Sequence, residues 1–270
     1  MKMMMMMKHM MKIMIQERNT KNNLYKTKVL RFGFFITASL AFISCQDKVL
    51  SARQIVEKSI EAHGGMDTWK NVKQLSFDKE TALFFEDGSV EVKTDQFQLF
   101  RFQPVLFGKI EWESDANDIV ITYDNEKIYK AINDSIITSS DELERAKNSF
   151  FAAQYVIVQP FALLDKDVEL TLKGQIEIEN KKVYEISVKY PSDTEASNKW
   201  SYFFDTESFE VIANKVELLD HTSWVENLTF ETASDYKFNA HRKSYRLNEA
   251  GEKTYLRAEY NYSNYKVHFK

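Results

Sequence analysis

The chain has 270 residues, a formal charge of −4 at pH 7 and a single cysteine. Residues 1–44 hold eight of the 36 lysines and arginines but one of the 40 acidic residues, so residues 45–270 carry 28 against 39, a formal charge of −11. Such an acidic chain is a poor nucleic-acid binder, because phosphate contacts need a basic face. One cysteine also excludes an internal disulfide, so stability must come from a hydrophobic core, which a chain of this length can build as one large domain.

The first 44 residues have the features of an export signal. Nine of the ten methionines precede Ile15, a pattern typical of an extended or mis-called translation start. Basic residues then precede an apolar stretch from Phe32 to Ile43, which is too short to be a comfortable transmembrane span. We interpret residues 1–44 as a signal peptide.

The only cysteine, Cys45, lies where this signal ends. The sequence AFISC resembles a bacterial lipobox, in which the cysteine is acylated and becomes the new N-terminus, although Phe42 stands where leucine is commonest. An ordinary signal peptide with an incidental cysteine is the alternative. A cysteine with several acyl chains anchors a protein stably. We therefore expect a lipidated tether over residues 45–50, a single domain over residues 51–270, and export to the outer membrane, facing the periplasm.

A helix is expected directly after the tether. Ser51 and Gln54 have the spacing of a capping box, and apolar or small residues recur at helical spacing up to His63. Gly64 and Gly65 then end the helix, because glycine readily adopts the backbone conformation of a helix C-terminus. We interpret His63, Gly64, Gly65 and Trp69 as a structural motif. A metal or catalytic role for His63 would need partner residues, and the sequence offers no metal-ligand spacing.

The pattern changes to a period of two after Val72. On one face of the segment LSFDKETALFF lie Leu75, Phe77, Thr81, Leu83 and Phe85. Further alternating segments, separated by turn residues, follow up to Tyr260. This pattern predicts an α+β fold that is mostly β: a strongly curled antiparallel sheet of about eleven strands, open or closed into a barrel.

A helical insertion interrupts the strands between Ser139 and Asp165. Its first part ends at Gln159-Pro160, and a second short helical turn is expected from Phe161 to Leu164. A helix in the middle of a series of strands can plug or cover the concave face of a curled sheet. The alternative is that it covers one sheet face, as in any α+β domain.

This order of elements resembles a known superfamily. A helix, Gly-Gly, Trp69, a long series of strands, the central QPFALLD (Gln159–Asp165) and WSYFFDTES (Trp200–Ser208) resemble the LolA/LolB-like lipoprotein carriers. The chain is more closely similar to a group of secreted bacterial lipoproteins that begin with AHGG and a tryptophan. The resemblance implies an incomplete β-barrel, closed over by an N-terminal helix and the central insertion, with an apolar cavity for acyl chains.

Several residues are candidates for contact with a ligand or a membrane. Arg101 lies between two phenylalanines, and in related carriers an arginine often holds the closed state of the cavity. The apolar residues Val105, Leu106 and Phe107 follow Pro104 in a loop, where polar residues are usual. This loop either folds back over the barrel mouth or protrudes as an apolar tip. The aromatic residues of the insertion complete the set: Phe150, Phe151, Tyr155 and Phe161.

Three functional classes remain open from the sequence. The first is a non-enzymatic, membrane-anchored protein that binds or carries lipid or lipoproteins, with acyl chains or other lipoproteins as partners and no metal or cofactor. The second is an envelope hydrolase, for which Asp220-His221, Asn239 and His241 are the only pieces on offer. The third is a structural envelope lipoprotein without a ligand. We favour the first.

Overall fold

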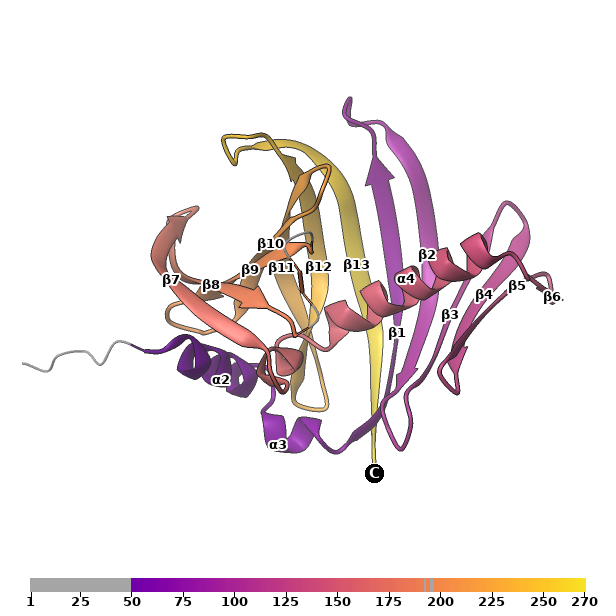
Figure 1. Cartoon of the computed structure of the whole chain (residues 1–270), viewed down its shortest axis with the longest axis horizontal. Coiled ribbons are helices and arrows are strands. Elements are labelled where there is room, and N and C mark those ends of the chain that lie inside the picture. Colours follow the sequence, from indigo (N-terminus) through magenta and orange to yellow (C-terminus); the bar gives the residue numbers. More distant parts are fainter. Residues whose placement is uncertain (1–49, 192, 195–196) are drawn as a thin grey trace, which may run out of the picture. The chain divides into compact units, whose positions relative to one another are not determined.

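One antiparallel sheet dominates the computed structural model, which describes residues 50–191, 193–194 and 197–270 (Figure 1). Cys45 and the predicted signal peptide lie outside the described residues. The strands are β1 (Val72–Phe84), β2 (Val90–Arg101), β3 (Phe107–Ser114), β4 (Asn117–Asp124), β5 (Lys127–Ile132), β6 (Ser135–Ile136), β7 (Glu169–Ile178), β8 (Lys181–Lys189), β9 (Lys199–Asp205), β10 (Val211–Glu217), β11 (Thr222–Ala233), β12 (Tyr236–Leu247) and β13 (Lys253–Phe269).

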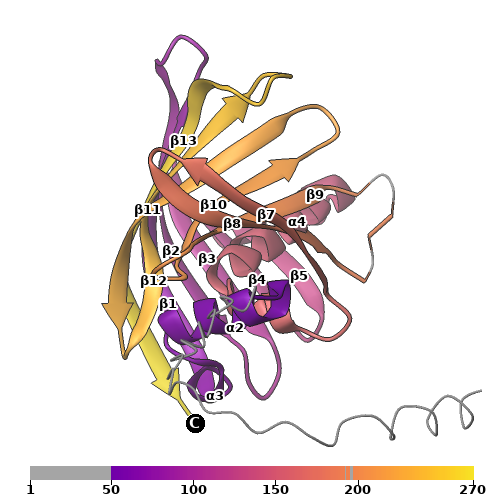
Figure 2. The same ribbon diagram turned by 90° about the vertical axis from the view of Figure 1, so that its left-hand side faces the viewer.

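The sheet curls without closing. Its strand order is β6-β5-β4-β3-β2-β1-β13-β12-β11-β10-β9-β8-β7, so the two halves of the chain meet where the last strand pairs with the first. Figures 1 and 2 show the strands bending around a central helix. The predicted fold, an incomplete and strongly curled antiparallel barrel with helices, is therefore confirmed.

The sheet differs from the prediction in its number of strands and in the end of its last strand. The sheet has thirteen strands instead of about eleven, and one of them, β6, is only two residues long. Strand β11 ends at Ala233, because Ser234 and Asp235 both adopt positive φ angles and turn the chain into β12. The final strand also continues well beyond Tyr260.

The N-terminal helix α2 (Ala52–Ala62) forms as its sequence predicts. Both hydrogen bonds of the capping box join Ser51 and Gln54. The expected stripe is buried, and it comprises Ala52, Ile55, Val56, Ser59, Ile60 and His63. This stripe packs against β7 and the short 3-10 helix η1 (Phe161–Leu164), below the strands in Figure 1.

The central helix α4 (Ser140–Ile157) crosses the concave face of the sheet (Figure 1). Its buried residues are Ala146, Phe150 and Ile157. The backbone of β3 approaches this helix closely at Gly108, where a Cβ atom would collide with the ring of Phe150. A close contact of this kind fixes the height of the helix above the sheet. None of the described helices is both long enough and apolar enough to cross a membrane.

Aromatic packing fills the lower part of the concave face, next to α2 and the four-residue helix α3 (Met66–Trp69). Phe77 lies between Phe100 and Tyr265, at ring-centroid distances of 6.3 and 5.1 Å. Phe238 stacks on Tyr265 at 4.6 Å. This packed floor ends where the side chains on the same strands become polar, and a pocket begins there.

Candidate ligand-binding pocket

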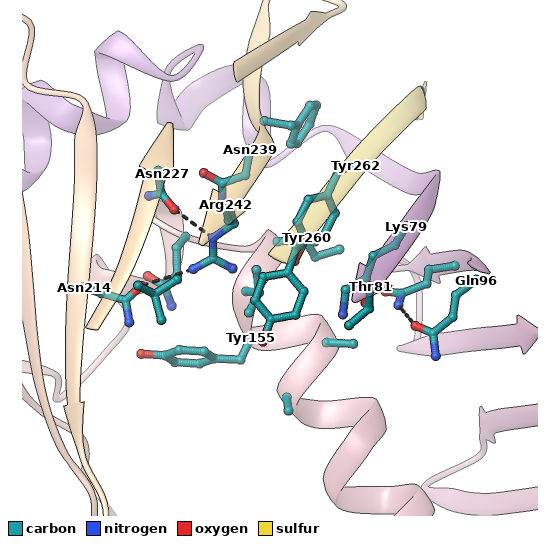
Figure 3. Close-up of a pocket in the computed structure, with 18 of the residues that line it drawn as sticks. Lys79, Thr81, Gln96, Tyr155, Asn214, Asn227, Asn239, Arg242, Tyr260 and Tyr262 are labelled. Atoms are coloured by element: carbon teal, nitrogen blue, oxygen red, sulfur yellow. Dashed lines mark hydrogen bonds between the residues drawn. The ribbon is translucent and has the colours of Figure 1, made fainter. Parts of the chain in front are cut away.

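A pocket of about 580 Å³ lies between α4 and the concave face of the sheet (Figure 3). Its volume is in the range of sites that hold small molecules. Its walls come from strands of both halves of the chain and from α4. The pocket therefore depends on the pairing of the last strand with the first.

Strand register places a polar row across the middle of the pocket. On β1, Lys79 is paired with Tyr262 of β13, and Thr81 is paired with Tyr260. Tyr260 is in turn opposite Arg242 of β12. Side chains two residues apart share one face of a strand, so these residues all point into the concave side. The row continues through Asn227 of β11 and Gln96 of β2.

Arg242 is the most buried charge of the pocket, with 6% of its surface exposed. Its Nε donates to Oδ1 of Asn227 at 2.8 Å, and its Nη2 donates to Oδ1 of Asn214 at 3.1 Å. Both acceptors are neutral amides, and Arg242 forms no ion pair with any described residue. Figure 3 shows the guanidinium extending from β12 into the pocket, between Asn214 and Tyr260.

A second cation, Lys79, reaches the same pocket from β1. Its Nζ lies 5.1 Å from the ring centroid of Tyr260 and 5.8 Å from that of Tyr262. It also lacks an ion-pair partner within the part of the chain that the structure describes. Lys237 differs, because Glu210 pairs with it at 2.6 Å. No aspartate or glutamate is found among the described residues that line the pocket.

The two cations change the acidity of a buried tyrosine. Burial alone would raise the pKa of Tyr262, but the positive charges of Lys79 and Arg242 outweigh it and lower the pKa below the usual value of 10.0. The pocket thus has a positive electrostatic potential next to its polar row.

Apolar side chains also line the pocket. They include residues of α4, namely Ala152, Ala153, Val156 and Ile157, together with Ile110, Trp112, Ile121, Val211 and Val216 from the sheet. Gln159, just after α4, also lines the pocket, and both polar atoms of its amide are buried without a hydrogen-bond partner in the structure. The pocket can therefore contact both hydrocarbon and a polar group.

A tyrosine cluster fixes the C-terminal end of α4 beside this pocket. The hydroxyl of Tyr155 lies 2.6 Å from that of Tyr190, and it also contacts the hydroxyl of Tyr202 on β9. Burial raises the pKa of Tyr155 and of Tyr202 well above the usual value, so both remain protonated donors. Of the four aromatic residues that the sequence singled out in the insertion, Tyr155 is the one that lines the pocket.

The other three aromatic residues pack in the core. Phe150 of α4 packs against Phe100 and Tyr123, and Phe151 of the same helix packs edge-on against Tyr123. Phe161 stacks on Trp69 with ring centroids 4.2 Å apart. These residues belong to the main core or pack against it, and none of them lines the pocket.

The motif at the end of α2 contributes His63 to the pocket lining. His63 is the C-cap of α2, and its Nδ1 lies 2.8 Å from the carbonyl oxygen of Ser59. Burial lowers its pKa from the usual 6.5, so the ring is neutral at pH 7. Gly64 and Gly65 follow with φ angles of 119° and 87°.

Arg101 and the apolar loop that follows it do not line the pocket. The guanidinium of Arg101 lies over the ring of Phe107, 4.8 Å from its centroid. Leu106 packs against the edge of the main core, whereas Val105 is 55% exposed. The loop therefore has one packed and one protruding apolar residue.

The residues considered for a hydrolase are dispersed. His221 lies 2.8 Å from the carboxylate of Asp220 in the turn after β10, where Asp220 is exposed. His241 pairs with Glu259 at 2.6 Å, and it faces away from the pocket because its neighbour Arg242 faces into it. Within the described residues, no three His, Cys, Asp or Glu side chains gather into a group suited to a metal ion.

The sequence pattern did not point to a site at the polar row, which comprises Lys79, Thr81, Gln96, Asn227, Arg242, Tyr260 and Tyr262, or at Asn214, which accepts from Arg242. One local signal could have found the centre of the row. In the β12 segment YKFNAHRKSYRL, Arg242 has the same period-two phase as Tyr236 and Phe238, which are core residues. A charged residue in phase with core residues is a candidate for a buried functional group.

The solved structures include a protein that shares this fold. A LolA superfamily protein from Nitrosomonas europaea aligns with a TM-score of 0.54 at 9% identity, over 81% of this chain and 94% of that protein. A DUF1329 family protein from Desulfovibrio piger aligns with a TM-score of 0.49 at 9% identity, over 80% of this chain and 93% of the other. No protein-family model and no curated protein matches the sequence. The chain has the LolA-like fold that its order of elements predicted.

Proposed function

We propose that this chain is a non-enzymatic lipid-binding protein of the cell envelope, held at the outer membrane by an acylated Cys45. The observation that carries the proposal is the pocket of about 580 Å³, with an apolar wall formed by α4 and its facing strands. Burial of hydrocarbon in such a wall contributes about 0.8 kcal/mol per methylene, so an acyl chain can bind without specific polar contacts. The acyl chain of a free lipid or of a lipidated protein is the ligand part that the apolar wall accommodates.

The shared fold with a LolA superfamily protein supports this proposal at the level of the fold. The hydrolase alternative receives no support from the geometry, because the histidines of the described residues form no cluster with a nucleophile inside the pocket. A catalytic site would also need groups aimed at a common point. The pocket instead combines a hydrocarbon wall with fixed polar side chains, the composition of a binding site.

Lipid that co-purifies with the chain tests the proposal. The full chain is expressed, extracted gently and analysed by mass spectrometry for bound lipid. Thr81 lines the pocket, whereas Ala82, its neighbour on β1, points to the convex face. We expect Thr81→Trp to fill the pocket and lose most of the lipid, while Ala82→Trp keeps it.

The same comparison separates pocket lipid from lipid that associates with the anchor, because both variants keep Cys45. Equal amounts of lipid in a folded Thr81→Trp variant and in the unchanged chain would refute the proposal. A complete absence of bound lipid from the unchanged chain would favour a structural envelope lipoprotein.

A further inference from the structure

The polar row contains two cations whose charge nothing in the described structure balances. Arg242 is almost fully buried and is held by two neutral amides, and Lys79 faces the rings of two tyrosines. An arginine stays charged at any pH that a protein tolerates. Burial of a charge without a counter-ion is costly, so a fold keeps such a group where a ligand supplies the opposite charge.

The pocket lining is positively charged although residues 45–270 are acidic overall, and this difference favours an anionic ligand. Residues 45–270 have eleven more acidic than basic residues, yet the described pocket lining includes Lys79, Lys237 and Arg242 and no carboxylate. Lys237 already has a partner in Glu210. The positive potential that remains comes from Lys79 and Arg242, and it lowers the pKa of Tyr262 between them.

The hydrogen-bonding capacity of Arg242 is only partly used. A guanidinium has five N–H donors; the two amides accept one bond from Nε and one from Nη2, and the hydroxyl of Tyr262 is a further hydrogen-bond partner of the group. The guanidinium that carries the remaining donors extends into the pocket (Figure 3). A planar guanidinium can donate two parallel bonds to one carboxylate or phosphate. Gln159 adds a buried amide without a partner to the same lining.

We propose that Arg242 and Lys79 bind the single negatively charged head group, carboxylate or phosphate, of an amphiphile whose acyl chain lies along the apolar wall of α4. This inference rests on the proposed function, and it names the class of lipid. Asn214 and Asn227 act as positioning residues, since they hold the guanidinium with its free donors toward the ligand. The two cations select the ligand for its negative head group, and the apolar residues of α4 select it for its acyl chain.

The test compares ligands that differ only in charge. Purified full-length chain, stripped of bound lipid, is titrated with palmitate and with hexadecanol, which has the same chain length and no charge. We expect palmitate to bind at least ten-fold more tightly than hexadecanol. Equal affinities would overturn the anionic class while leaving the lipid-binding proposal intact. Failure of both to bind would refute the lipid-binding proposal itself.

Variants then locate the selectivity. Arg242→Gln should lose the preference for palmitate and keep its affinity for hexadecanol, while Arg242→Lys should retain part of the preference. Arg246→Gln is the matched control, because Arg246 lies on the same strand and donates to Ser223 outside the pocket. An unchanged preference in a folded Arg242→Gln variant would overturn the inference.

Further measurements keep the test decisive. Melting temperature separates binding from folding: removal of an uncompensated buried charge should leave it unchanged or raise it. If Arg242→Gln fails to fold, Lys79→Met provides the same comparison from the other side of the pocket, and an unchanged palmitate preference there would overturn the inference.

Palmitoyl lysophosphatidate identifies a phosphate head group if it binds more tightly than palmitate. Displacement of palmitate by inorganic phosphate at equal concentration would overturn the amphiphile.

Discussion

At Gly64 a single residue joins the end of α2 to the sheet. Its φ angle is 119°, which residues with a side chain rarely adopt. A Cβ atom there would lie 2.5 Å from the Tyr236 ring and 3.0 Å from the carbonyl oxygen of Asp235. Glycine therefore satisfies two separate constraints at this position, one of conformation and one of space.

Gly64→Ala should therefore lower the free energy of unfolding by about 2–4 kcal/mol, the sum of backbone strain and a steric collision. Denaturant unfolding measures the loss. Gly251→Ala is the control, because Gly251 has a φ of 81° but no atom within 4 Å of the added methyl, so it reports strain alone. If both variants lost the same stability, the collision with Tyr236 would not matter.

The residues of the polar row show why the site was only partly predictable from local sequence: the phase of Arg242 on β12 marks one member but not the residues that join it. Leu75, Phe77, Thr81 and Leu83 were assigned to one face of β1, and Lys79 falls within the same period-two series. A lone lysine in such a series gives no sign of a partner. Only the pairing of β1 with β13 brings Lys79 opposite Tyr262, about 180 positions later in the chain. Contacts of this kind depend on tertiary register, which a single sequence does not contain.

At the scale of the element, the loop between β2 and β3 has two different apolar residues. Val105 protrudes and is 55% exposed, whereas Leu106 packs against the core. The sequence left two alternatives for this loop, a folded-back cover and an apolar tip. In the structure Leu106 folds back onto the core and Val105 protrudes, so each alternative describes one of the two adjacent residues.

A pair of glutamate substitutions tests this division. Leu106→Glu should lower the melting temperature clearly, because a carboxylate without a partner is costly in a packed environment. Val105→Glu should leave the melting temperature unchanged and weaken association with lipid vesicles if the tip contacts a membrane. Thermal unfolding and vesicle flotation measure the two effects. Unchanged flotation of Val105→Glu would remove the membrane role of the tip, and unchanged melting of Leu106→Glu would contradict its packing.

Helices were predictable because their signals are local. The capping box at Ser51, the buried stripe of α2 and the short turn from Phe161 to Leu164 all depend on residues within one or two helical turns. Strand ends were less predictable. The turn at Ser234-Asp235 uses residues other than glycine at positive φ, so the usual hairpin signal is absent.

At the scale of the whole molecule, the sheet separates charge between its surface and its interior. Acidic residues outnumber basic ones over residues 45–270, while the pocket lining within the described residues carries positive side chains only. Pairing of β1 with β13 creates this interior, since Lys79 and Arg242 come from opposite ends of the chain. The pocket and its charge are consequently properties of the complete fold.

The proposed attachment to a membrane can be tested separately from the pocket. We expect Cys45→Ser to abolish acylation, because no other residue of the chain is a cysteine. The variant should appear as an uncleaved precursor or as a soluble protein, while Ser44→Ala, which keeps the cysteine and a small residue before it, should remain lipidated. Labelling with a palmitate analogue and membrane fractionation measure both outcomes. Palmitate label that survives in Cys45→Ser would contradict the lipid anchor. Soluble Cys45→Ser should still co-purify with pocket lipid, since the residues of the pocket are all distant from Cys45 in the sequence.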